Sequence, residues 1–134
     1  LQNKRPQLRS DGSYIRDYLY IEDAVDAYIC LAEKLQLQPE LAGEAFNFSL
    51  ERPETVKEFT ENILRTLGSP LQPEILDLPE AKFEIPIQRL SAEKARRLLN
   101  WKPKYGLEEG LTRSIKWYSE YLASYRKIPG AEIV

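Results

Sequence analysis

Apolar residues recur at helical spacing in two stretches of the first half of the chain. Between residues 21 and 36 they return every three or four positions, which places them on one face of a helix. Thr55 and Glu58 have the spacing of a capping box, so a second helix is predicted from Thr55 to about Leu67, where Gly68 ends it. The predicted inward face of the first helix comprises Ile21, Ala24, Val25, Tyr28, Leu31, Ala32 and Leu35.

Two further helices are predicted in the second half. Ser91 can cap a helix that runs to Asn100, and the last helix covers about 107–125. The predicted inward face of the helix at 91–100 comprises Ala92, Ala95, Leu98 and Leu99. Trp117 and Tyr121 form a second stripe beside the apolar face of the last helix. This stripe either packs against the preceding helix or contacts a further part of a larger protein.

Short runs of apolar, aromatic and β-branched residues predict strands between the helices. They lie at 6–9, 14–20, 44–49 and 73–78, and an irregular connection follows at 79–86. Short strands together with about four helices predict a mixed α and β (α+β) fold.

Composition agrees with one small domain. The 134 residues carry a net charge of −2, which argues weakly against a nucleic-acid partner, and the basic cluster near residue 96 lacks interleaved aromatics. Cys30 is the only cysteine, no histidine is present, and no long apolar span occurs. We therefore expect no disulfide, no metal site, no membrane partner and a cytoplasmic location for a single domain of residues 1–134, with a flexible tail at 127–134.

The most informative stretch is Asp11–Val25, where one arginine stands within an apolar strand. Gly12 suits a tight turn, and the aromatic and β-branched residues that follow favour a strand. Arg16 lies in the middle of that strand. An arginine there must be paired or must face a ligand.

This stretch resembles a segment of the extended short-chain dehydrogenase/reductase family. Within that family, it is similar to the NAD-dependent nucleotide-sugar epimerases and 4,6-dehydratases. Residues 43–49 are similar to the next strand of that family, and residues 90–103 to its late helix with a following Asn-Trp-Lys-Pro. Residues 107–111 are similar to the start of its last helix, so the resemblance extends from about residue 5 to residue 121. Within the family, the sequences of residues 5–12 and 90–95 most resemble those of CDP-glucose 4,6-dehydratases.

Two features of that family are missing from this chain. None of the six glycines forms the glycine-rich turn that holds NAD, and none of the eight tyrosines has a lysine four residues later. The resemblance therefore implies a C-terminal substrate-binding part without the Rossmann half, which would be inactive and bind no NAD alone. NAD would belong to the full-length parent, and a start at Leu1 without any methionine fits a fragment. Apolar surface normally covered by the missing half predicts self-association.

The resemblance assigns substrate binding to Arg16, whose planar fork of donors matches the pyrophosphate of a nucleoside diphosphate sugar. The alternative is a structural salt bridge to Asp17 or Asp23. Asp17 and Asp23 themselves are expected to be structural, since Asp23 lies in the first turn of a helix.

Three further residues are candidates for the substrate site. Tyr18 or Tyr20 is expected to border the site while the other packs inward, and Arg9 would line the nucleotide end unless it is a solvated surface residue. Related epimerases carry a second phosphate-binding arginine where this chain has Ala81 and Lys82, so Lys82, or Arg89, would act as a point charge.

Three functions remain open from the sequence. The chain is the substrate-binding part of a nucleotide-sugar 4,6-dehydratase, the same part of a 4-epimerase, or a stand-alone ligand-binding or interaction module without catalysis.

Overall fold

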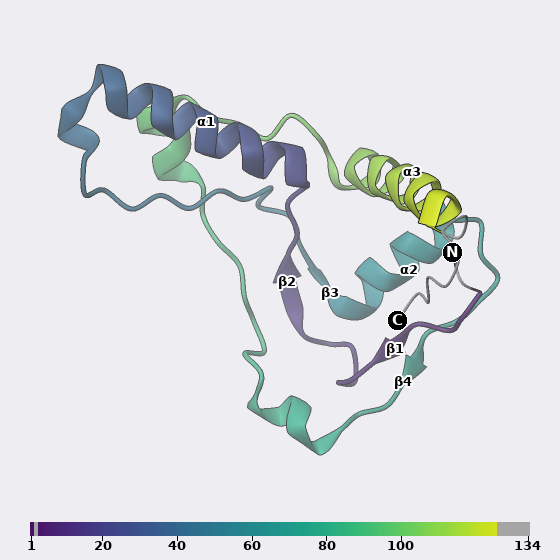
Figure 1. The fold of residues 1–134 in the computed structure, drawn as a ribbon. Coiled ribbons are helices and arrows are strands. Elements are labelled where there is room, and N and C mark those ends of the chain that lie inside the picture. Colours follow the sequence, from purple (N-terminus) through teal and green to yellow (C-terminus); the bar gives the residue numbers. More distant parts are fainter. Residues whose placement is uncertain (2, 126–134) are drawn as a thin grey trace.

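The computed structural model describes residue 1 and residues 3–125, and it has a mixed α and β fold as predicted (Figure 1). Its strands are short and form two pairs, in which β1 runs parallel to β4 and β2 runs antiparallel to β3. The predicted tail at 127–134 lies outside the described residues. The helices are α1 (Ile21–Leu37), α2 (Val56–Thr66) and α3 (Leu107–Tyr125), and the strands are β1 (Gln7–Leu8), β2 (Ile15–Asp17), β3 (Pro53–Thr55) and β4 (Glu74–Ile75).

The boundaries of α2 confirm the capping box. The Glu58 amide donates to the Thr55 hydroxyl at 3.1 Å, and the Thr55 amide donates to the Glu58 carboxylate at 2.9 Å. The Thr55 amide and the Thr55 hydroxyl both donate to the Glu58 carboxylate, and these two hydrogen bonds lower the pKa of Glu58. Gly68 has a φ of +61°, a backbone conformation that suits glycine at a helix end.

The predicted helix at 91–100 is short and closes with a single π-helical turn, Ala95–Leu99. Asn100 ends it with a φ of 56° in the left-handed region, and the Trp101 amide donates to the carbonyl of Ala95 at 3.3 Å. This geometry turns Leu99 and Trp101 inward together.

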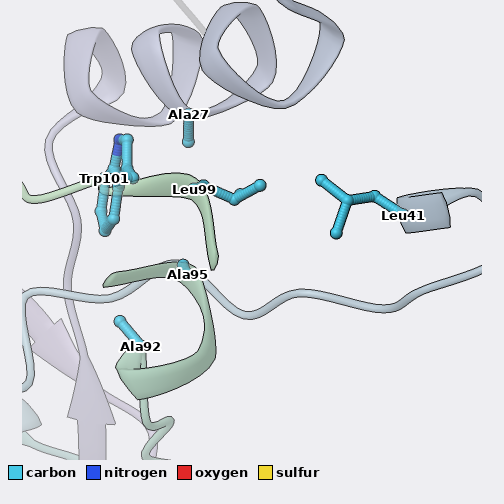
Figure 2. Close-up of a cluster of buried hydrophobic side chains, with 6 residues drawn as sticks. All are labelled: Ala27, Leu41, Ala92, Ala95, Leu99 and Trp101. Carbon is cyan, nitrogen blue, oxygen red and sulfur yellow. The ribbon is translucent and has the colours of Figure 1, made fainter. Parts of the chain in front are cut away.

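The main core lies between α1 and this short helix (Figure 2). Ala92, Ala95 and Leu99 face inward as predicted, with Ala27 of α1 above them. The Trp101 ring meets the Phe48 ring edge to face, with 5.0 Å between centroids. The buried members of the cluster are Ala27, Leu41, Ala92, Ala95, Leu99 and Trp101.

The strand predicted at 44–49 is wrong. In the part of the chain that the structure describes, this segment pairs with no strand, although Phe46 and Phe48 pack against the core cluster. The partner of β2 is instead Pro53–Thr55, which the sequence pattern did not predict. A strand needs a ladder partner as well as suitable residues, and the alternation of side chains alone does not reveal which segment supplies it.

The predicted inward face of α1 is only partly correct. Ile21, Val25 and Tyr28 are 66%, 51% and 75% exposed, and the fully buried positions are Asp23 and Ala27. We call Ile21, Val25, Tyr28 and Ile29 the outer face of α1. Since α1 is apolar on this face as well as toward the core, it has the composition of a helix enclosed between two layers.

The aromatic stripe of α3 is not covered by the preceding helix. Trp117 stacks on Tyr121 with 5.2 Å between ring centroids and meets Tyr118 edge to face. All three side chains remain about half exposed.

Candidate functional site

Arg16 lies in the middle of β2, and the backbone fixes the direction of its side chain. Its Nη1 donates to the carbonyl of Ile15 and to the carbonyl of Ile85, each at 2.9 Å. The side chain is 21% exposed. The guanidinium is therefore held in one orientation.

Arg16 is paired with Glu84, not with Asp17 or Asp23. Its Nη2 lies 3.3 Å from Oε2 of Glu84, and Nη2 of Arg9 lies 2.9 Å from Oε1 of the same carboxylate. The structure thus brings two of the predicted site residues, Arg9 and Arg16, together through one acidic residue. We call Arg9, Arg16 and Glu84 the arginine–glutamate cluster.

Glu84 reaches this position because the stretch after the turn at Pro79–Phe83 passes beside β2 (Figure 1) and forms a parallel bridge between Ile87 and Ile15. The Ile15 amide donates to the carbonyl of Pro86 at 2.8 Å, and the Gln88 amide donates to the carbonyl of Ile15 at 3.0 Å. Glu84 was missed from the sequence, since no local pattern reports a contact between residues 68 positions apart.

Asp17 and Asp23 hold the backbone, as expected. Oδ2 of Asp17 accepts from the Ser49 hydroxyl at 2.5 Å and from the Leu90 amide at 3.2 Å. Asp23 is completely buried and accepts from the Lys104 and Tyr105 amides at 2.7 and 3.2 Å. Asp23 therefore ties the start of α1 to the segment that precedes α3.

Tyr18 lies among aromatic side chains. Its ring stacks on Phe59 of α2 with 3.5 Å between centroids. Burial raises the pKa of the Tyr18 hydroxyl, and the charge of Arg16 opposes this shift. The phenol is consequently neutral at physiological pH.

Tyr18 and Tyr20 both line a cavity of about 650 Å³ between the start of α1, α2 and α3. Its other aromatic walls are Phe59, Tyr105, Trp117 and Tyr118. Tyr20 also packs on Gly110, where an added Cβ would lie 3.0 Å from the Cβ of Tyr20. The arginine–glutamate cluster contributes no residue to the lining of this cavity.

Lys82 is exposed on the turn Pro79–Phe83, two residues before Glu84. Arg89 is also exposed. The role of Lys82 as a point charge stays a prediction.

Gly12 and Gly110 lie where the backbone is closely approached by other residues. Gly12 has a φ of +86°, and an added Cβ would lie only 2.9 Å from the Cβ of Lys57. Gly110 is in contact with Tyr20. At both positions an added side chain would press on its neighbours.

None of the helices described is long and apolar enough to cross a bilayer. No group of three or more acidic, cysteine or histidine side chains within residues 1 and 3–125 is arranged to hold a metal ion.

No protein-family model matches the chain, but comparisons with individual proteins agree with one another. The chain is 27% identical over 118 residues to UDP-glucose 4-epimerase of Mycolicibacterium smegmatis, covering 88% of this chain and 36% of the epimerase. Its fold matches the UDP-glucose 4-epimerase of Thermotoga maritima solved with UDP-glucose, with a TM-score of 0.73, 25% identity and coverage of 89% and 36%. It also matches the dTDP-glucose 4,6-dehydratase of Bacillus anthracis solved with NAD, with a TM-score of 0.71, 25% identity and coverage of 89% and 36%.

The matched proteins are nucleotide-sugar epimerases and dehydratases. This agrees with the family resemblance seen in the sequence and with the mixed α and β fold. Most matches are 4-epimerases, and a specific likeness to CDP-glucose 4,6-dehydratases is not confirmed. The chain spans 36% of the length of the relatives named above.

Proposed function

We propose that this chain is the nucleotide-sugar-binding, C-terminal part of an NAD-dependent nucleotide-sugar 4-epimerase or 4,6-dehydratase. The observation that supports the proposal most strongly is Arg16 on β2, whose guanidinium is held by the carbonyls of Ile15 and Ile85 and remains partly exposed. A fixed planar fork is suited to two phosphate oxygens of a nucleoside diphosphate. The similarity to proteins solved with UDP-glucose and with NAD supports the same substrate class and cofactor for the parent.

The choice between the two reactions rests on different observations. The sequence of residues 90–95 favours a 4,6-dehydratase, specifically one that acts on CDP-glucose. The larger number of 4-epimerases among the matched proteins favours a UDP-sugar 4-epimerase. In either enzyme, the residues of this chain would bind and orient the nucleoside diphosphate, with Arg16 at the pyrophosphate.

NAD and the catalytic acid–base residues would lie in a further part of the protein. When bound there, NAD would accept and return a hydride of the sugar. Within this chain, Arg16 and Arg9 would neutralise the diphosphate charge. The neutral Tyr18 would border the site where it adjoins the aromatic cavity.

The outer face of α1 supports the idea that a further part packs here. An apolar helix face exposed over several turns is normally covered, and residues 44–50 run extended beside α1 with no strand partner in the described chain (Figure 1). We propose that the missing Rossmann half covers the outer face of α1 and pairs with residues 44–50. Its strand edge would supply the backbone partners that this segment lacks.

The outer face of α1 should also make the isolated chain self-associate. Replacing Val25 and Tyr28 together by glutamate is expected to weaken self-association by at least roughly tenfold, because each buried side chain contributes about 1.5–3 kcal/mol. Sedimentation velocity over a range of protein concentrations measures this. Glu33→Gln, at an exposed polar position of the same helix, is the matched control and should associate as the unchanged chain does. A monodisperse unchanged chain that unfolds cooperatively at ordinary mesophilic temperature would contradict the prediction.

The function is tested by Arg16→Ala in the longer protein. Loss of charge-assisted hydrogen bonds of about 1.5–3 kcal/mol is expected to lower affinity for UDP or CDP roughly 10- to 150-fold, with NAD binding unchanged. Isothermal titration calorimetry gives the affinities, and the melting temperature is measured on the same samples. Arg97→Ala, at an exposed arginine of the short helix, is the control and should leave both values near those of the unchanged protein. A large fall in melting temperature with unaltered nucleotide affinity would show that Arg16 is a structural residue.

A further inference from the structure

The Glu84 carboxylate lies between the guanidinium groups of Arg9 and Arg16, which are the kind of groups that bind a phosphate. We propose that its carboxylate holds the position between Arg9 and Arg16 that a substrate phosphate takes, so that Glu84 competes with the substrate and must move aside for it to bind. This inference rests on the proposed function, since it assumes that Arg16 binds the diphosphate.

The first argument is the geometry of the carboxylate. Each of its oxygens faces a different arginine, with Oε1 at 2.9 Å from Nη2 of Arg9 and Oε2 at 3.3 Å from Nη2 of Arg16. A phosphate group offers paired oxygens to guanidinium donors in the same way. Two arginines and one glutamate leave one positive charge uncompensated, so the arginine–glutamate cluster keeps an attraction for a further anion.

The second argument is that the two arginines are held differently. Arg16 donates to the carbonyls of Ile15 and Ile85, two hydrogen bonds that do not involve the Glu84 side chain. The side chain of Arg9 is 73% exposed, and its ion pair is with Glu84. If the carboxylate moved away, Arg16 would therefore keep its orientation, and Arg9 could move toward the incoming phosphate.

The third argument is that Glu84 is easily displaced. Its side chain is 33% exposed, its contact with Arg16 is long, and ion pairs at such exposed positions contribute little to stability. Its backbone, however, is anchored, because the Glu84 amide donates to the carbonyl of Ala81 at 3.0 Å and Pro86 is bonded to β2. The side chain can thus swing out while the backbone beside Arg16 stays in place.

The test compares Glu84→Gln with Glu80→Gln in the 134-residue chain. Glu80 is exposed on the turn Pro79–Phe83, and both variants change the net charge equally, so Glu80→Gln controls for long-range attraction. Binding of inorganic pyrophosphate is followed by ³¹P NMR titration at two salt concentrations. Glu84→Gln is expected to raise affinity about five- to tenfold with a steeper dependence on salt, and Glu80→Gln should change it less than about twofold.

Arg16→Ala in the same titration separates the two proposals. If Arg16→Ala weakens pyrophosphate binding but Glu84→Gln binds no more tightly than Glu80→Gln, the inference about Glu84 is wrong and the proposed function stands. Weaker binding by Glu84→Gln also overturns it, because Glu84 would then only support the arginines. If Arg16→Ala leaves binding unchanged, or if neither the unchanged chain nor Glu84→Gln binds pyrophosphate at about 10 mM, the proposed function fails together with the inference.

Discussion

Replacing Leu99 with alanine is expected to lower the free energy of unfolding by about 2–5 kcal/mol. Leu99 is 1% exposed and lies in the core cluster between Ala27 and Ala95 (Figure 2). Its removal leaves a cavity that these small neighbours cannot fill, and the loss is a large share of the stability of an ordinary domain. Urea unfolding followed by circular dichroism measures the change.

The control for Leu99 is Leu37→Ala. Leu37 is at the end of α1 and 76% exposed, so its truncation should cost less than about 0.5 kcal/mol. Equal losses for the two variants would mean that the short helix at 92–99 does not form the centre of the core.

Replacing Asp23 with alanine is expected to cost about 3 kcal/mol of unfolding free energy. The carboxylate is completely buried and accepts the amides of Lys104 and Tyr105, which would lose their acceptor inside the protein. Asp23→Asn keeps one acceptor oxygen and should lose less. Thermal and urea unfolding of both variants give the values.

The control for Asp23 lies three residues further along the same helix. Asp26 forms a surface ion pair with the Lys104 side chain, and Asp26→Ala should cost less than about 1 kcal/mol. If the Asp23 and Asp26 variants lose the same stability, the two backbone hydrogen bonds are not what joins α1 to the segment before α3.

The sequence located α2 and α3 closely because their signals are local. Thr55 and Glu58 satisfy each other's backbone groups within a single turn, and Gly68 adopts the left-handed conformation that ends the helix. The inward positions Ala92, Ala95 and Leu99 were also predicted correctly, since helical periodicity alone determines which residues share a face.

The sequence predicted only some of the residues that meet around Arg16. Arg16 was found because a charged residue is unusual in an apolar strand, and Arg9 was found through the family resemblance. Their shared partner Glu84 and the carbonyl of Ile85 lie about 70 residues further along the chain, and nothing in their own neighbourhood indicates this contact. Whether Arg9, Arg16, Tyr18 and Lys82 bind substrate stays a prediction.

The sequence by itself determined where the helices lie, the cap of α2 and the unusual position of Arg16, because each depends on residues within a few positions of one another. Only the tertiary structure decided that β2 pairs with Pro53–Thr55 and leaves 44–49 unpaired, and that α1 turns Asp23 and Ala27 inward. Strand pairing is a choice among distant segments, and a helix that is apolar on two sides does not specify which side meets this core. Both outcomes depend on which surfaces meet when the chain folds, and periodicity along the sequence contains no information about that.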